Sequence, residues 1–207
     1  GGKSRPIQIA DPLAPGGRRT QTWRFSSRDE CLRCHNPWSE YTLAFNLSQL
    51  NREHPYGSVT DNQIRTLRHI DLLADVVDDP QRKDQLVRAA TPRPIESLPT
   101  LTPPFAAEGN IEDRARSYLH VNCGHCHRFN GGGSAYIYLQ RELSLAEMKI
   151  LGNRPTQGTF GMPDAHLVTA GDPYRSVLYY RLAKSGPGHM PHLGAIGISK
   201  KRNADVA

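Results

Sequence analysis

The amino-acid sequence predicts a mostly α-helical protein with extensive loops, little sheet and two small domains. Three observations support this fold class. Several short apolar stretches at helical spacing follow helix-capping residues. The 18 glycines and 16 prolines among 207 residues assign much of the chain to loops. One cysteine pattern occurs twice, once in each half of the chain, which indicates two similar local units.

The first half is predicted to contain an arm and three short helices. Residues 1–22 are rich in Gly, Pro and Arg and are expected to form a linker or arm. Ser27-Arg28-Asp29-Glu30 is a capping box that starts a helix just before Cys31. A second capping box at 60–63 starts a helix that is expected to run to about Asp75. Residues 80–90 are expected to form the third helix.

The second half follows a proline-rich segment, 91–110, which is the predicted domain boundary. We expect the first domain at 23–90 and the second at 111–197, followed by a polar tail at 198–207. Hydrophobic residues make up only 37% of the chain, so side chains alone provide a small core for two domains. A bound apolar group is expected to supply the missing volume.

Three helices are predicted in the second half. Asn110 is the expected N-cap of a helix that leads directly into Cys123. Ser144 begins a capping box for a short helix. Asp172-Pro173 starts a third helix, with proline in its first turn, which is expected to end near Gly186.

All four cysteines lie in two copies of the pattern C-x-x-C-H, which are CLRCH at 31–35 and CGHCH at 123–127. Two thiols at this spacing can form thioether bonds with one haem, and the adjacent histidine can bind its iron. On a helix, the first cysteine and the histidine of each copy share a face. The sequence therefore predicts two covalent haem c groups, attached through Cys31, Cys34, Cys123 and Cys126 and ligated by His35 and His127.

Two other uses of the cysteines are weighed against haem. A zinc site built from both C-x-x-C pairs would enclose the 88 residues between Cys34 and Cys123, which is long for a compact finger. A pair of disulfides is the second alternative. Both alternatives leave His35 and His127 without a role, so two copies that use every cysteine favour haem.

The second haem needs a sixth iron ligand, and Met190 is the expected one. Met190 lies in a loop framed by glycine and proline, Gly186-Pro187-Gly188-His189-Met190-Pro191, which can hold a thioether over a haem face. The alternative is that Met190 only packs and that His189 or His192 binds. Methionine ligation raises the haem potential, whereas ligation by two histidines leaves it lower.

The sixth ligand of the first haem is less clearly marked. His69 is favoured because it lies in the helix expected to follow residue 62, beside an apolar face. His54 and Met162 are the alternatives, and an open iron is a fourth. His125 lies between the cysteines of its own motif, so it is expected to make a surface or propionate contact instead.

Net charge and hydropathy restrict the location and the partners. The formal charge is +6, but four ionised haem propionates would offset much of it, and the basic residues are dispersed, so nucleic-acid binding is not expected. No window is apolar enough for a transmembrane helix. The chain begins Gly1-Gly2 and not with Met, so a removed export signal is expected. Haem attachment of this kind occurs outside the bacterial cytoplasm, which indicates a periplasmic or otherwise exported protein.

Five segments resemble bacterial dihaem c-type cytochrome domains, which occur alone or fused to exported proteins such as quinoprotein-type dehydrogenases. They are WRFSSRDECLRCH at 23–35, LSQLNR at 47–52, ARSYLHVNCGHCH at 115–127, GDPYRSVL at 171–178 and MPHLG at 190–194. The resemblance implies covalent haem at both motifs, Met190 as a distal ligand and a second domain like a small class I cytochrome c. Such cytochromes usually continue into a C-terminal helix, so the polar tail implies that this helix is truncated or lost.

Electron transfer is the expected function. Electrons would enter at the first haem, which has the lower potential if two histidines ligate it, and leave by the methionine-ligated second haem. The expected partners are redox proteins, such as a dehydrogenase domain or a larger respiratory assembly. One alternative is a dihaem peroxidase-like enzyme with an open iron and His54 or His166 as the acid–base group. The other is a metal-stapled interaction module without haem.

Overall fold

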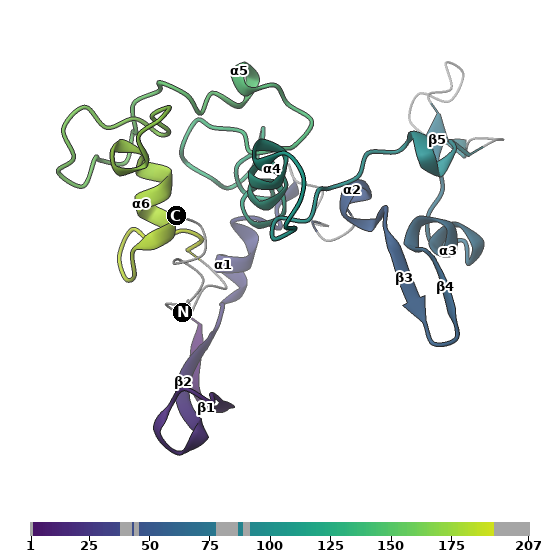
Figure 1. The fold of residues 1–207 in the computed structure, drawn as a ribbon, viewed down its shortest axis with the longest axis horizontal. Helices are drawn as coiled ribbons and strands as arrows, with labels where there is room; N and C mark the ends of the chain where they lie inside the picture. The colour runs from purple at the N-terminus through teal and green to yellow at the C-terminus, as the bar shows by residue number, and fades with distance from the viewer. Residues whose placement is uncertain (1, 38–42, 44–45, 78–86, 89–91, 193–207) are drawn as a thin grey trace. The chain divides into compact units, whose positions relative to one another are not determined.

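A computed structural model describes the chain except for residues 1, 38–42, 44–45, 78–86, 89–91 and 193–207 (Figure 1). The chain divides into two compact units. Unit 1 combines Gly1–Tyr41 with Leu119–Ala207, and unit 2 is Thr42–Tyr118. Unit 1 is therefore assembled from two segments that are distant in the sequence, and both C-x-x-C-H motifs belong to it.

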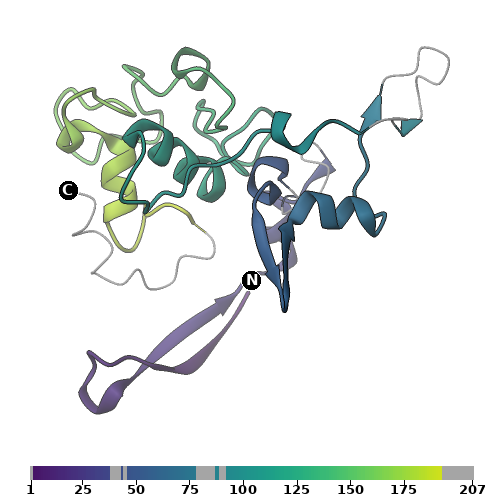
Figure 2. The ribbon, with the colours of Figure 1, turned by 45° about the vertical axis from the view of Figure 1, so that its right-hand side comes forward.

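Unit 1 begins with an exposed antiparallel ribbon (Figure 2). Strands β1 (Lys3–Ala10) and β2 (Arg18–Phe25) pair along their whole length, with Lys3 opposite Phe25 and Ala10 opposite Arg18. The short helix η1 (Pro15–Gly17) connects the strands, and its two glycines take the positive φ that this turn needs. The predicted arm is thus a defined ribbon.

The remaining elements of unit 1 are short helices joined by long loops. They are α1 (Arg28–Leu32), the last four residues of α4 (Ile111–Asn122), α5 (Leu145–Met148), η4 (Pro173–Arg175) and α6 (Val177–Ala183). The capping boxes at Ser27 and Ser144 are confirmed, because each serine accepts from the backbone of a glutamate three residues later. Asn110 also caps α4, since its side-chain oxygen accepts from the Glu112 amide at 2.8 Å.

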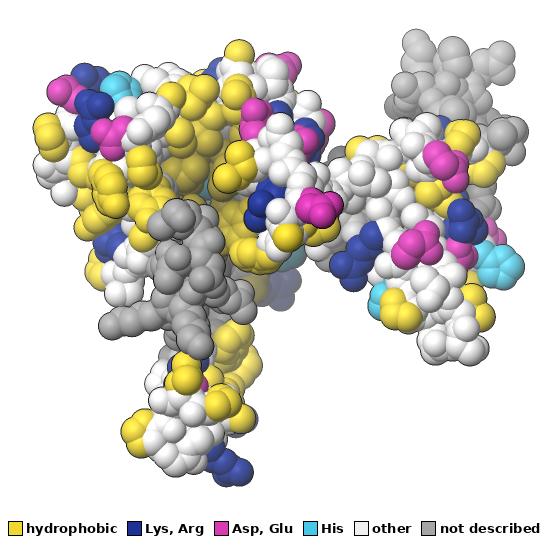
Figure 3. Space-filling view, viewed as in Figure 1, with side chains coloured by type: hydrophobic (Ala, Val, Ile, Leu, Met, Phe, Trp, Pro, Cys, Tyr) yellow, Lys and Arg dark blue, Asp and Glu magenta, His cyan; other side chains and the backbone are white. Residues whose placement is uncertain are grey.

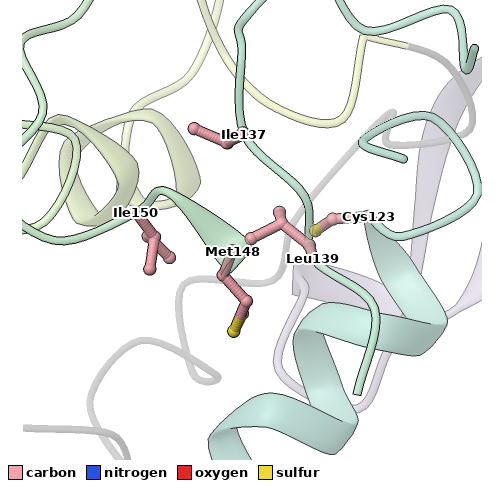
Figure 4. Close-up of a cluster of buried hydrophobic side chains, with 5 residues drawn as sticks. All are labelled: Cys123, Ile137, Leu139, Met148 and Ile150. Carbon is pink, nitrogen blue, oxygen red and sulfur yellow. The ribbon is translucent and has the colours of Figure 1, made fainter. Parts of the chain in front are cut away.

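The core of unit 1 is a small hydrophobic cluster beside the second motif (Figure 4). Leu139 and Met148 are almost completely buried, and Ile137 and Ile150 lie with them against the thiol-bearing Cys123. Met148 is positioned by the α5 capping box, and Lys149 ends that helix in the left-handed conformation. The second C-x-x-C-H motif is therefore built on the best-packed part of the unit.

Unit 2 contains two ribbons, two complete α-helices, the first eight residues of α4 and a buried asparagine pair. Its other elements are α2 (Leu47–Leu50), β3 (Glu53–Tyr56), β4 (Val59–Asn62), α3 (Gln63–His69), β5 (Val76–Val77), β6 (Val87–Arg88) and η3 (Ile95–Ser97). The ribbons pair β3 with β4 and β5 with β6, both antiparallel. The predicted boundary segment, 91–110, falls inside this unit.

The predicted fold class is wrong. Helix accounts for 29% and strand for 17% of the structure, and three two-stranded antiparallel ribbons are present among the residues described. The strands of β1–β2 are largely exposed, and their sequences alternate between apolar and polar residues only over short stretches, Ile7-Gln8-Ile9 and Trp23-Arg24-Phe25, which are too short to mark a half-buried strand. The chain is better described as loop-rich with both helices and ribbons.

Two predicted helices also have wrong boundaries. The capping box expected at 60–63 is absent, because Thr60 and Asp61 pair in β4 and Asn62 caps α3 with its side chain. That helix ends at His69 and not near Asp75, and Asp71 follows it with φ of 60°. The helix expected at 172 is broken at Ser176 into η4 and α6, and α6 ends at Ala183. Most of the helix expected at 80–90 lies outside the described residues.

The buried asparagine pair of unit 2 generates a stability prediction. Asn62 Nδ2 donates to Asn51 Oδ1 at 2.8 Å, and Asn51 Nδ2 donates to the Leu98 carbonyl at 3.0 Å. Asn62 Oδ1 also caps α3 by accepting from the Ile64 amide. We expect Asn62→Ala to lower the free energy of unfolding by about 2–3 kcal/mol, because it removes a cap and leaves a buried acceptor unpaired. Chemical denaturation of the variant measures this change.

Asn153→Ala is the control for this prediction. Asn153 also donates a side-chain hydrogen bond to a backbone carbonyl, but it is exposed and belongs to unit 1. Its replacement should cost under about 1 kcal/mol. Equal losses of unfolding free energy in the two variants would contradict the larger contribution proposed for the buried asparagine pair.

Candidate functional site

The first motif forms a single helical turn at the end of α1. Cys34 N–H and His35 N–H both donate to the Cys31 carbonyl, at 3.1 and 2.9 Å. The turn is anchored upstream by the capping box, in which Glu30 accepts from Ser27 N and pairs with Arg24 at 2.6 Å. Hydrogen bonds from the Ser27 backbone and Arg24 lower the pKa of Glu30, so this carboxylate stays charged. Cys31 and His35 are thereby held one turn apart.

The second motif repeats this backbone conformation at the end of α4. Cys126 N–H and His127 N–H donate to the Cys123 carbonyl, at 3.1 and 2.8 Å. Gly124 is required here, because a Cβ at this position would lie 2.7 Å from the His120 carbonyl oxygen. Both copies of C-x-x-C-H therefore present their first cysteine and their histidine in the same local geometry.

A disulfide between Cys34 and Cys126 joins the two motifs. The Cα atoms of these cysteines are 5.7 Å apart, although they are separated by 92 residues in the sequence. The backbone of Gly132 also packs against the first motif, since a Cβ there would overlap the Arg33 carbonyl. The two motifs thus lie side by side within unit 1.

The other two cysteines are free thiols in different environments. Cys31 is exposed, whereas Cys123 is buried in the hydrophobic cluster. Burial raises the pKa of the Cys123 thiol to about 11, because the thiolate is poorly solvated there. The pair of disulfides weighed as an alternative is not observed, because a single disulfide crosses between the motifs and leaves one free thiol in each.

His127 lies in a partly buried, electropositive environment. Its Nδ1 atom is buried without a hydrogen-bond partner among the described residues. Burial lowers the pKa of His127, and His125, His192 and Arg181 add to this effect by charge repulsion. The neutral imidazole that results is the form that binds iron. The lowered pKa therefore suits the predicted ligand role of His127.

His125 is less exposed than expected for a surface residue. It is half-buried, and desolvation lowers the pKa of its imidazole. His35 contributes to the same shift by charge repulsion, so the histidines of the two motifs lie within electrostatic range of each other. This proximity is a second consequence of the joined motifs.

The loop that carries Met190 belongs to unit 1 with both motifs. Met190 is half-buried, and its amide donates to the Arg181 carbonyl at 3.0 Å. His189 Nδ1 donates to the Lys184 carbonyl at 2.7 Å, and His192 is exposed. His192 lies close enough to His127 to lower its pKa by charge repulsion. The Met190 loop and the second motif are therefore within electrostatic range of each other.

The candidates for the sixth ligand of the first haem fall in different units. His69 is exposed at the end of α3, and His54 lies on β3 with its ring 4.7 Å from Tyr56. Both belong to unit 2, whereas Met162 is half-buried in unit 1. The assignment of His69 stays a prediction.

The donor set fits two haem groups in spacing and backbone conformation, with one condition. Each motif holds a histidine one helical turn after its first cysteine, and large hydrophobic side chains remain exposed over unit 1, where a bulky apolar group would cover them (Figure 3). They include Trp23, Phe25, Leu32, Phe129 and Phe160. The condition is reduction of the Cys34–Cys126 disulfide, because thioether formation uses both sulfur atoms. Within the described ranges, no group of three or more His, Cys, Asp or Glu side chains could hold a metal ion.

The sequence interpretation missed two residues near the motifs. Gly132 allows the close approach to Arg33, and the signal for it was the run of three glycines, which is typical of close backbone contact. Arg181 bonds to the Gly188 carbonyl and repels His127. No sequence pattern marks Arg181, because its side-chain partners are the backbone carbonyls of Gly188 and Gln157.

Comparisons with known proteins identify no relative of this chain. No family model, curated protein or solved structure matches it. In the part of the chain that the structure describes, no helix has the length and apolar character needed to span a membrane. The functional argument therefore depends on the chain's own residues.

The two free thiols predict a difference in reactivity. In the haem-free chain at neutral pH, we expect an alkylating reagent to modify Cys31 rapidly and Cys123 slowly, because only the thiolate reacts and burial suppresses it at Cys123. Peptide mass spectrometry over time measures both rates. Cys34→Ser should release Cys126 as a third reactive thiol, and equal labelling of Cys31 and Cys123 would contradict the arrangement.

The buried His120 of α4 predicts an acid-sensitive stability. Its Nδ1 accepts from the Arg141 amide at 3.0 Å, and burial lowers the pKa of His120 below its usual 6.5. The unfolded chain then binds more protons than the folded chain as the pH falls below about 6.5, so folding stability decreases, by at most about 1.4 kcal/mol per pH unit. His120→Asn keeps an acceptor without titrating and should flatten this part of the pH–stability curve. Denaturation at several pH values measures the slope.

Glu142→Gln gives the companion test. The Glu142 carboxylate lies 3.8 Å from His120 Nδ1 and raises the pKa of His120, against the effect of burial. Removing its charge should therefore make unfolding slightly more acid-sensitive, which is opposite to the effect of His120→Asn. The same direction in both variants would refute the assignment to His120.

Proposed function

We propose that this chain is a dihaem c-type cytochrome that transfers electrons outside the cytoplasm. The observation that supports it best is that both C-x-x-C-H copies adopt the same helical turn and lie side by side in one unit. Redox proteins are the proposed partners, such as a dehydrogenase domain or a larger respiratory assembly. The exposed aromatic and aliphatic side chains of unit 1 suit both haem contact and partner contact.

Each residue of the site has a defined task in this proposal. Cys31, Cys34, Cys123 and Cys126 attach the haem groups, and His35 and His127 bind the irons. Haem supplies one-electron chemistry, so no side chain needs to transfer a proton. The protein instead sets the potentials through the axial ligands and burial.

Met190 and His69 are the proposed sixth ligands of the second and first haem. A thioether ligand would make the second site more oxidising than a first site with two histidines. Electrons would then pass from the first haem to the second. Burial lowers the pKa of His127, which favours the neutral imidazole that binds iron and so supports His127 as the proposed proximal ligand of the second haem.

An exported location agrees with the sulfur chemistry. Disulfides persist in oxidising compartments such as the bacterial periplasm and are rare in the cytosol. The Cys34–Cys126 pairing supports a periplasmic location for the same reason. It also implies that a reductant acts on the haem-free chain before the haem groups are attached.

Production in a host that attaches haem c tests the proposal. We expect an intact mass equal to the polypeptide plus two haem groups. Potentiometry should then resolve two potentials, with the second site higher. His127→Ala should remove or strongly lower the higher potential, and His35→Ala the lower one, because each loses its proximal ligand.

His166→Ala is the matched control, since His166 is half-buried in unit 1 and lies outside both motifs. It should leave both potentials unchanged. A mass equal to the bare polypeptide would overturn the proposal. Rapid binding of cyanide at one iron would instead favour the peroxidase-like alternative with an open site.

A further inference from the structure

Arg181 connects α6 to the loop that carries Met190 through both its side chain and its backbone. The guanidinium Nη1 donates to the Gly188 carbonyl at 2.9 Å, and Nη2 donates to the Gln157 carbonyl at 3.1 Å. The carbonyl of the same residue accepts from the Met190 amide at 3.0 Å. One residue therefore fixes the loop at two positions, two residues apart, and ties it to a third segment of the chain.

The Phe160 ring packs against both the Arg181 guanidinium and the backbone of the Met190 loop. The Arg181 guanidinium carbon is 4.6 Å from the centre of the Phe160 ring, a cation–π distance. Gly188 has φ of 85°, and a Cβ there would lie 2.9 Å from a ring carbon of Phe160. Tyr180 also packs against Phe160, with their ring centres 4.8 Å apart. The loop backbone, the ring and the guanidinium thus contact one another directly.

We propose that Arg181 is a positioning residue that holds Met190 in place as an iron ligand of the second haem. This inference rests on the proposed function. A planar guanidinium can donate to two carbonyls while stacking on a ring, which a lysine ammonium cannot reproduce. Lys184 also contacts this loop, since its Nζ donates to the Pro187 carbonyl and its own carbonyl accepts from His189 Nδ1. Neither of these two bonds involves Met190.

Arg181→Lys tests this role because it keeps the positive charge and removes the planar guanidinium that donates to the Gly188 and Gln157 carbonyls together. Two readouts are measured on the haem-bearing protein. The first is hydrogen exchange of the 186–190 segment, which reports the loop. The second is the pH at which ferric protein loses the charge-transfer absorption band of a methionine–iron bond, which reports the ligand.

We expect loop exchange to rise at least about tenfold, which corresponds to about 1.4 kcal/mol of lost hydrogen bonding. The pH midpoint for loss of the band should fall by about one unit for the same reason. Arg181→Gln should give at least these shifts. Phe160→Leu, which keeps both hydrogen bonds, should give smaller shifts in the same direction and covers the case in which an Arg181 variant fails to fold.

Arg175→Lys is the matched control. Arg175 lies in the same unit, on η4, and its guanidinium pairs with Asp172 at 2.7 Å, away from the Arg181 hydrogen bonds to the Met190 loop. Both readouts should stay at their wild-type values in this variant. If Arg181→Lys changes neither the hydrogen exchange of the loop nor the pH midpoint of the absorption band, the positioning role is overturned and the proposed function stays intact. A protein without haem would overturn both, so the two failures are distinguishable.

Discussion

The link between Cys34 and Cys126 is the constraint on which the organisation of unit 1 depends. It joins a segment that ends at residue 41 to one that begins at residue 119. Closing a loop of this length in the unfolded chain corresponds to about 4–5 kcal/mol of chain entropy in the simplest model. The Gly132 backbone against Arg33 provides a second connection. Through these contacts the β1–β2 ribbon and α1 belong to the same unit as α5 and α6.

The packing of this unit leaves room for additional apolar surface. Its buried cluster is small, and among the described residues more large hydrophobic side chains are exposed than buried. Burial of such side chains is the main favourable contribution to folding, at about 25 cal/mol per Å². A porphyrin covered by these side chains would provide the contacts that the polypeptide lacks. The low hydrophobic content of the sequence and the exposed side chains of the structure therefore agree.

Local sequence signals predicted some elements and failed for others. The capping boxes at Ser27 and Ser144 depend on hydrogen bonds within four residues, so a short stretch of sequence determines them. The β1–β2 ribbon has no buried residue, and its apolar–polar alternation is too short to identify it from the sequence. Asn62 was hidden inside an apparent capping box, because its neighbours Thr60 and Asp61 pair in a strand.

The candidate site shows the same division. The backbone turn of each C-x-x-C-H copy follows from a pattern of five residues. The pairing of Cys34 with Cys126 does not, because four cysteines permit three connectivities and the sequence favours none. The Arg181 guanidinium donates to carbonyl oxygens 7 and 24 residues away, and backbone atoms carry no sequence signature.

The insertion of unit 2 between the two segments of unit 1 also imposes an order in time. During synthesis, Cys34 leaves the ribosome 92 residues before Cys126. At about 5–20 residues per second, this delay is roughly 5–20 s. Throughout that interval Cys31 is the nearest available thiol in the sequence, so the nascent chain offers the first motif intact to the enzymes that it meets. The cross-linked pairing is thus a late product, accessible only to chains whose first motif has remained unmodified until translation of the second.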